Sequence, residues 1–482
     1  MLFNSIEYLF FLPIVFLIYW AIGNARIKDS LKLRTQNLFV VIASYVFYGW
    51  WDWRFLLLIA FTSFCSWGSG LLIDKSRESR VKRSKFWLWL NIAINIGILA
   101  IFKYYDFFVS EFGALFGINT SSLLLRVILP VGISFYTFQA LSYSIDVYRG
   151  NIKPTKDIIA FFAFISFFPQ LVAGPIERAT NLLPQFLQNR KFSYDQGVDG
   201  MRQILWGLFK KIVIADNCAT YVDQVWSTYG TQSGSTLLLA AVLFTFQIYG
   251  DFSGYSDIAI GTAKLFGIKL MRNFNIPYFS RDIAEFWRRW HISLTTWFRD
   301  YVYIPLGGSR VGKWKIVRNT FIIFLVSGIW HGSNWTFLAW GAYHAVLFLP
   351  LILLGKNRRY VNKESRVERG EWREIPRMVL TFGLVVIGWI IFRVETIGQA
   401  WEIMRGICDM SLFTMPMMVV GLKKTLFFIV ILLIVEWIDR NQEHAFALSR
   451  LPQWARIIVI YGLILIMLEF MGHSQSFIYF QF

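Results

Sequence analysis

Long apolar runs separated by short basic loops constrain this chain more than any other feature. Charged residues make up 16% of the sequence, against about 25% in soluble domains, so the runs indicate a membrane environment. Several runs are shorter than the roughly 20 residues that a membrane-spanning helix needs, which favours re-entrant helices shielded by protein. We therefore predict an all-α polytopic membrane protein with about 11–13 membrane and re-entrant helices. The strong candidates are residues 6–22, 55–73, 86–102, 235–249, 335–354, 378–392, 425–437 and 457–471, and the weaker ones are 38–51, 123–145, 158–173, 201–215 and 321–330.

The basic residues give the chain a net charge of +18 and gather in the loops between apolar runs. In a soluble protein such a charge would indicate nucleic-acid binding. Here it fits the positive-inside rule and attraction to anionic lipid headgroups, so we expect a lipid bilayer as partner and no nucleic acid. Two loops are predicted to be cytoplasmic, residues 74–85 and residues 356–377, and the second contains Lys363, Arg366 and Arg369.

The organisation of the chain is simple, because it shows no internal repeat and no soluble domain. We expect one membrane-embedded domain over residues 1–482, with a catalytic core at about residues 123–350 and C-terminal membrane helices at residues 378–471. The run at residues 6–22 lacks the basic start of a cleavable signal and is predicted to be a retained span. Motifs of hydrolases, P-loop ATPases and zinc proteins are missing from the sequence, and no metal site is expected.

His331 lies where an ionisable side chain is costly, between the apolar runs at residues 321–330 and 335–354. At about 1.5 Å per helical residue it lies roughly 20 Å from the basic Arg318, near the middle of a membrane. Both runs return to basic loops, so we expect a helix–break–helix hairpin with His331 near its tip and the break at residues 332–334. An ionisable group at this depth indicates a functional site, and histidine suits proton transfer near neutral pH. A structural histidine, hydrogen-bonded between helices, is the alternative.

His291 lies in the longest non-apolar stretch of the interior, residues 271–318. Apolar side chains between residues 281 and 300 recur at intervals of three and four, which predicts one amphipathic helix. Such a helix either lies in the plane of the membrane interface or packs into the bundle as the wall of a site. His291 is then either a surface residue or a site residue. His344, within the run at residues 335–354, is predicted to be structural.

Residues 249–257, with the sequence YGDFSGYSD, interrupt another apolar run with polar groups. Three interpretations stay open. The stretch is a helix break that lines a catalytic cavity, a cation or proton site in a transporter with discontinuous helices, or a turn at the membrane edge whose aspartates cap helices.

Several motifs together resemble the membrane-bound O-acyltransferase family. They are RRWHISLTTWFRDYVYIPLGG at residues 288–308, GIWHG at 328–332, PVGISFYTFQ at 130–139, AGPIER at 173–178, GDFSGYSD at 250–257 and MLFNS at 1–5. The resemblance extends from the N-terminus past residue 350 and is strongest to the branch that O-acetylates alginate. It implies a ring of helices around a central tunnel, with the acyl donor entering from the cytoplasm and the acceptor from outside.

The resemblance also implies roles for individual residues. His331 matches the family's essential histidine, which would act as general base, and His291 matches its second polar position. Arg288 and Arg289 are expected to bind the donor, because basic side chains suit the phosphates of coenzyme A. The expected cavity-lining residues are Trp330, Asn334, Asp251, Ser253, Tyr255 and Asp257.

The implied function is transfer of an acetyl group from acetyl coenzyme A toward hydroxyls of an extracellular polysaccharide, such as alginate, in the bacterial inner membrane. A separate periplasmic or extracellular acetyltransferase is the expected partner, and no permanently bound cofactor is expected. The alternatives are D-alanyl transfer to teichoic acid, peptidoglycan O-acetylation and, in another class, a proton-coupled transporter that uses Asp251 and Asp257. Whether the direct acceptor is a sugar hydroxyl or a nucleophile on the partner stays open.

Overall fold

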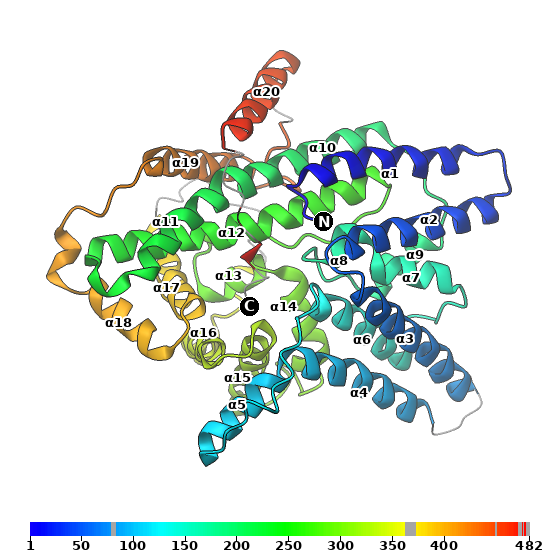
Figure 1. The fold of residues 1–482 in the computed structure, drawn as a ribbon, viewed down its shortest axis with the longest axis horizontal. Coiled ribbons are helices and arrows are strands. Elements are labelled where there is room, and N and C mark those ends of the chain that lie inside the picture. The colour runs from blue at the N-terminus through cyan, green and yellow to red at the C-terminus, as the bar shows by residue number, and fades with distance from the viewer. Residues whose placement is uncertain (79–82, 362–372, 449–450, 471–474, 476, 479–482) are drawn as a thin grey trace. The chain divides into compact units, whose positions relative to one another are not determined.

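A computed structural model describes residues 1–78, 83–361, 373–448, 451–470, 475 and 477–478. The described secondary structure is entirely helical, as predicted (Figure 1). The chain divides into two compact units. Unit 1 comprises residues 1–201 and 259–271, and unit 2 comprises residues 202–258 and 272–482. Two of the three unit boundaries fall within α10 (Tyr194–Phe209) and α12 (Gly234–Leu265), and the third follows residue 271. The ring of helices, the central tunnel and the single domain over residues 1–482 stay predictions.

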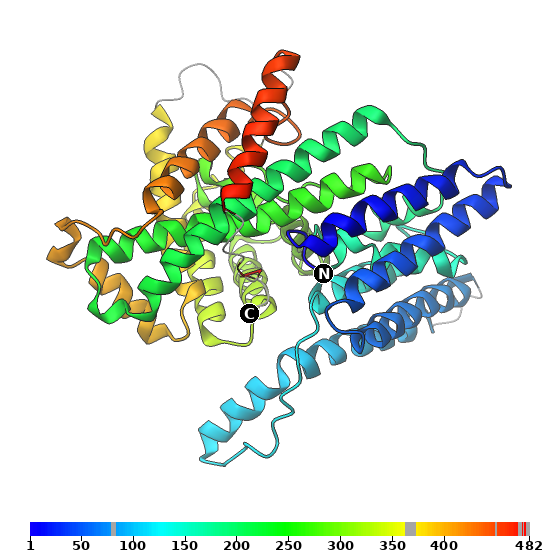
Figure 2. The same cartoon turned by 45° about the horizontal axis from the view of Figure 1, so that its top comes forward.

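Unit 1 contains the amino-terminal helices and the last turns of α12. Its first two helices run side by side in both views (Figure 2). Tyr8 and Tyr19 on the first helix hold the end of α12, because the Tyr8 hydroxyl lies 2.8 Å from the Thr262 hydroxyl and the Tyr19 hydroxyl donates to the Phe266 carbonyl at 3.0 Å. The helices are α1 (Ile6–Asn24), α2 (Asp29–Gly49), α3 (Phe55–Glu78), α4 (Ser84–Lys103), α5 (Tyr105–Phe116), α6 (Ile133–Arg149), α7 (Ile158–Ser166), α8 (Phe168–Leu171) and α9 (Ala179–Phe186).

Unit 2 contains the candidate site, and two of its helical segments, η1 and η4, are π-helical. Short π segments inside helices occur frequently at functional sites. The elements are η1 (Lys210–Ala215), α11 (Asp216–Ser227), η2 (Tyr229–Thr231), η3 (Pro277–Phe279), α13 (Ile283–Arg289), α14 (Ile292–Phe298), η4 (Arg299–Tyr303), α15 (Lys313–His331), α16 (Trp335–Leu353), α17 (Ile375–Arg393), α18 (Ile397–Ile407), η7 (Met410–Phe413), α19 (Leu422–Ile438) and α20 (Gln453–Phe470).

Seven of the described helices are long and apolar enough to cross a membrane, namely α1, α3, α4, α12, α16, α17 and α20. All seven correspond to strong candidates from the sequence, and the eighth, residues 425–437, forms α19, which has 17 residues. The weaker candidate at residues 123–145 is wrong in its first part, because α6 begins only at Ile133, after Pro130 and a Gly132 with φ of +74°. The loop residues Lys363, Arg366 and Arg369 lie outside the described residues.

The hairpin predicted around His331 is confirmed. α15 ends at His331, residues 332–334 are not helical, and α16 follows with the Asn334 side chain accepting from the Thr336 N–H at 3.0 Å. Glycine allows the two helices to approach closely. A Cβ atom at Gly328 would lie 2.3 Å from the Phe337 carbonyl oxygen, so a larger residue there would collide with the backbone of α16.

We predict that Gly328→Ala destabilises the purified protein, because a backbone oxygen cannot move aside as a flexible side chain can. The expected loss is about 1–3 kcal/mol, seen as a lower melting temperature in detergent. Gly383→Ala on α17 is the matched control, since its Cβ would meet no atom within 4 Å. Its melting temperature should stay equal or rise, because alanine favours helix. Equal shifts in both variants would contradict the close approach.

Candidate functional site

His331 is buried at the end of α15, with 6% of its surface exposed. Three aromatic rings surround its imidazole nearly edge-on, at ring-centre distances of 4.9 Å for Trp330, 5.0 Å for Trp340 and 5.2 Å for Phe392. Trp340 belongs to α16 and Phe392 to α17. This packing holds the imidazole in one orientation and excludes bulk water, which are conditions for directed proton transfer.

The single helix predicted over residues 281–300 is wrong, because the chain forms two short helices there. α13 and α14 are separated by a junction that contains His291. The tryptophans and phenylalanines of both helices are buried, Trp287 and Trp297 among them. Of the two interpretations left open by the sequence, the structure therefore agrees with packing into the bundle and not with a helix in the membrane interface.

The junction has a backbone cause. The Ile292 N–H, which would bond within a continuous helix, donates to the Asn273 carbonyl at 2.8 Å, and the Arg289 carbonyl accepts from the Asn275 N–H at 2.9 Å. These bonds remove one donor and one acceptor from the helical pattern. His291 adopts a φ of +43°, a conformation that is uncommon outside glycine and often found at functional sites.

The hydrogen bonds of His291 define its tautomer. Asn273 Oδ1 accepts from the backbone N–H of Ser293 at 3.3 Å, and a backbone N–H can only donate, so this atom is the amide oxygen. His291 Nδ1 lies 3.0 Å from the same oxygen and therefore carries a proton. Burial lowers the pKa of His291 to about 3, which keeps the ring neutral at pH 7. The lone pair is then on Nε2, which can accept a hydrogen bond from a hydroxyl.

The two predicted catalytic histidines both contact the indole of Trp330. The Trp330 ring centre lies 4.9 Å from that of His331 and 6.0 Å from that of His291. Phe252 of α12 packs edge-on against His291 at 4.6 Å. The structure thus brings His331, His291 and the predicted lining residue Trp330 into one buried aromatic cluster of unit 2.

The interruption predicted at residues 249–257 is wrong, because α12 is continuous across this stretch. Lysines of η1 neutralise its aspartates. Lys210 Nζ lies 2.6 Å from the Asp257 carboxylate, and Lys211 Nζ lies 2.8 Å from the Asp251 carboxylate. A buried carboxylate is tolerated when it is paired and hydrogen-bonded, so polar residues can remain in a buried helix without breaking it.

The other predicted lining residues lie at different places in unit 2. Ser253 accepts from Lys210 Nζ at 2.9 Å and belongs to the lysine–aspartate cluster, and Tyr255 is buried on the same helix. Asn334 caps α16 beside the hairpin tip. Within the part of the chain that the structure describes, no group of three or more His, Cys, Asp or Glu side chains is placed to hold a metal ion.

A cavity of about 440 Å³ has walls from α13, α14, η4, α15, the end of α16 and the segment that follows α16. Thr320, Phe324 and Ser327 line it from α15, and their spacing of four and three residues puts them on one face of the helix. His331 lies four residues after Ser327 and continues this face. It therefore lies one helical turn, about 6 Å, beyond the last lining residue of α15.

Arginines line the other part of this cavity, and they are Arg288, Arg299 and Arg358. The Arg299 guanidinium also pairs with its neighbour Asp300, at 2.6 Å. Arg288 donates to the Asn357 carbonyl at 3.1 Å, so α13 contacts the segment that follows α16. Sequence reasoning found Arg288 and missed the other two. Arg299 lies within the 288–308 motif and Arg358 within the basic loop, and this clustering of positive charge was the signal available for both.

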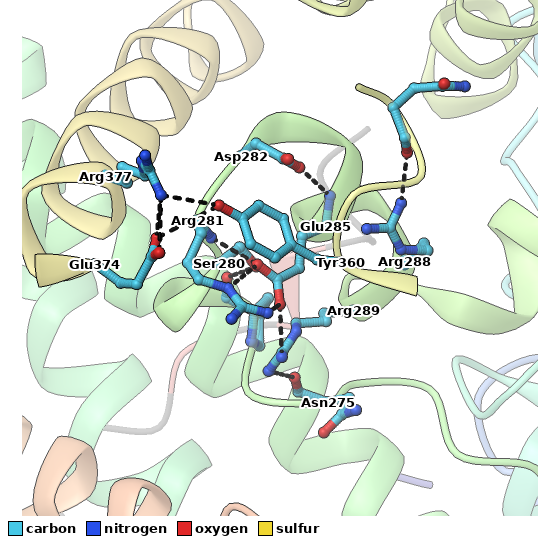
Figure 3. A network of polar contacts seen from close by, with 12 residues as sticks. Asn275, Ser280, Arg281, Asp282, Glu285, Arg288, Arg289, Tyr360, Glu374 and Arg377 are labelled. Atoms are coloured by element: carbon cyan, nitrogen blue, oxygen red, sulfur yellow. Dashed lines mark hydrogen bonds and ion pairs between the residues drawn. The ribbon is translucent and has the colours of Figure 1, made fainter. Parts of the chain in front are cut away.

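Arg289, the second predicted donor-binding residue, is instead engaged with protein (Figure 3). Its guanidinium lies 2.8 Å from the fully buried Glu285, which also pairs with Arg281 at 2.8 Å. The Arg281 guanidinium lies 3.9 Å over the ring of Tyr360. This network ties α13 to the segment after α16, and of the two predicted arginines it is Arg288 that lines the cavity.

Comparison with known proteins gives consistent matches. The model of the membrane-bound O-acyltransferase family matches residues 151–387. The chain is 41% identical to a probable alginate O-acetylase of Pseudomonas aeruginosa, over 83% of this chain and 74% of the relative. It is 34% identical to a peptidoglycan O-acetyltransferase of Helicobacter pylori (85% and 80%), and 30% identical to a teichoic acid D-alanyltransferase of Bacillus subtilis (54% and 68%).

We predict that His291 makes the fold acid-sensitive. Its pKa is about 3 in the folded protein and about 6.5 when unfolded, so below pH 6.5 the unfolded state takes up a proton that the folded state does not. The free energy of unfolding should therefore decrease as the pH is lowered below 6.5, by at most about 1.4 kcal/mol per pH unit. Melting temperatures from pH 7 to pH 5 should decline more steeply for the wild type than for His291→Asn, and equal slopes would contradict the neutral buried ring.

Proposed function

Since the chain belongs to the membrane-bound O-acyltransferase family, we propose that it moves an acetyl group from a cytoplasmic donor toward hydroxyls of an extracellular polysaccharide. The chain is a multi-pass membrane protein and an acyltransferase. Its similarity to a probable alginate O-acetylase over most of its length supports alginate or a similar exopolysaccharide as the final acceptor. The proposed location is the bacterial inner membrane, with the basic loops on the cytoplasmic side.

The observation that carries this proposal is the cavity that follows α15 toward His331. Its three arginines suit the phosphates of acetyl coenzyme A, because guanidinium groups bind phosphate oxygens in bidentate fashion. Its apolar wall, which includes Phe324 and Trp287, suits the uncharged thioester end of the donor. A donor bound with its phosphates at the arginines would extend its acetyl group along α15 in the direction of His331.

His331 is proposed as the general base. As the acceptor hydroxyl oxygen attacks the thioester carbon, the imidazole takes the hydroxyl proton. The carbon–sulfur bond then breaks, and the imidazolium returns the proton to the leaving thiolate. His291, neutral and with its lone pair on Nε2, is proposed to accept a hydrogen bond from a second donor group of the acceptor molecule and so to orient the attacking hydroxyl.

A separate periplasmic or extracellular acetyltransferase is proposed as the partner that completes transfer to the polymer. The direct acceptor is then either a sugar hydroxyl or a nucleophile on that partner. Either acceptor would meet the same requirement at His331, because each must lose a proton as it attacks the thioester.

The alternative functions are supported less well. Peptidoglycan O-acetylation is the nearest, since the Helicobacter pylori relative covers a similar share of this chain at 34% identity. D-alanyl transfer rests on relatives that cover about half of the chain. A transporter function was suggested by the expected helix break at residues 249–257. That support is gone, because α12 is unbroken and its aspartates are paired with lysines.

We predict that His331→Ala lowers acetyl transfer by about 10²–10⁴-fold, the usual contribution of a general base. Transfer is measured as labelled acetyl appearing on the polymer in membranes that contain the partner. The melting temperature of the purified variant reports whether the fold survives. Ser333→Ala, in the adjacent break, is the matched control and should retain activity. Near wild-type acetylation by His331→Ala would refute its role.

We further predict that Arg299→Ala and Arg358→Ala each raise the KM for acetyl coenzyme A by about tenfold or more, the value of a lost charge-assisted hydrogen bond. The kcat should change little, because phosphate contacts are equal in the ground and transition states. Lys356→Ala is the control, since Lys356 is an exposed basic residue of the same loop and does not line the cavity. Equal effects of all three variants would mean general electrostatic attraction and no defined site.

A further inference from the structure

Two tryptophans separate the cavity from His331. Trp287 lines the cavity, and its ring centre lies 5.5 Å from that of Trp340, which is fully buried. Trp340 in turn lies 5.0 Å from the ring of His331. We propose that Trp287 and Trp340 form an aromatic gate that sets the size of the acyl group reaching His331. This inference rests on the proposed function, because it assumes a thioester donor in the cavity.

The position of the gate follows from α15. The lining row Thr320, Phe324 and Ser327 stops one turn before His331. Of the two indoles, Trp287 contacts this row and Trp340 contacts His331. Trp287 packs against Phe324 at 5.4 Å on the cavity side. A donor that advances along α15 therefore meets Trp287 first and Trp340 next, before its thioester carbon reaches the imidazole.

His344 is the residue that holds the gate. It lies one helical turn after Trp340 on α16 and is 1% exposed. Its imidazole stands edge-on to Trp287, at 4.9 Å and 89°, and contacts Trp340 at 5.1 Å and 73°. Gly388 of α17 leaves room for it, because a Cβ there would lie 2.8 Å from His344 Nε2. His344 is thus a positioning residue that fixes both indoles from behind.

Such a gate can select among acyl groups by sterically excluding the longer ones. An apolar pocket by itself favours longer acyl chains, because each added methylene gains from burial. Discrimination against them must come from rigid side chains that do not yield. Close-packed indoles held by an immobile imidazole meet this condition, since every extra methylene would have to displace a ring that has no free space behind it.

The test compares acetyl, propionyl and butyryl coenzyme A as donors for the full-length protein in membranes with its partner. In Trp340→Ala and Trp287→Ala the ratio of kcat/KM for butyryl over acetyl should rise about tenfold or more, the usual discrimination for methylene groups. Trp335→Ala is the matched control on α16, since Trp335 is 52% exposed and should keep the wild-type ratio. An unchanged ratio in both gate variants overturns the gate.

The positioning role of His344 is tested by replacing its ring with a small side chain and with another ring. His344→Ala should raise the butyryl-to-acetyl ratio, whereas His344→Phe, which keeps a ring behind the indoles, should retain it. Equal ratios in the two variants overturn the positioning role.

If an alanine gate variant does not fold, Trp340→Phe and Trp287→Phe replace it, and an unchanged ratio in both then overturns the gate. Failure of the wild type to transfer any acyl group would overturn the proposed function itself, whereas acetyl transfer with unaltered selectivity overturns the gate alone.

Discussion

The close packing of α15 against α16 is the interaction on which the rest of the site depends. Gly328 and Gly341 let the two backbones approach closely, because a Cβ atom at either position would collide with a carbonyl oxygen of the other helix. Because α16 is held there, Trp340 meets His331 and His344 meets Trp287. The same contact forms part of the cavity wall. The cavity is lined by residues of α15 and α16 that lie away from the hairpin tip, toward the end that carries the basic loop.

Polar groups in this apolar interior follow one rule, which is compensation of each charge by a specific partner. Asp251 and Asp257 have lysines of η1, and Glu285 has two arginines. His291 avoids the cost in another way, because burial favours its neutral form, and aromatic edges pack against both histidines. Arg299 at the cavity likewise pairs with Asp300, at 2.6 Å.

The sequence predicted the features that depend on neighbouring residues. The seven long helices follow from apolar runs of about 20 residues. The hairpin at His331 follows from the polar break between two apolar runs. The junction at His291 could not be predicted, because its cause is hydrogen bonding to Asn273 and Asn275, which local periodicity does not report. The continuity of α12 was missed for the same reason, since its aspartates are neutralised by lysines of a separate segment. Arg358 reaches the cavity only because the chain after α16 folds back on α13.

The proposed reaction requires a donor that binds at the arginines and extends along α15 to His331. The most direct measurement is a cryo-electron microscopy structure of the purified protein with a non-hydrolysable analogue of acetyl coenzyme A. Density is expected for the phosphates beside Arg288 and Arg358 and for the acyl end beside Trp287, directed at His331. An analogue bound outside this cavity, or inside it with its acyl end turned away from His331, would contradict this mode of donor binding.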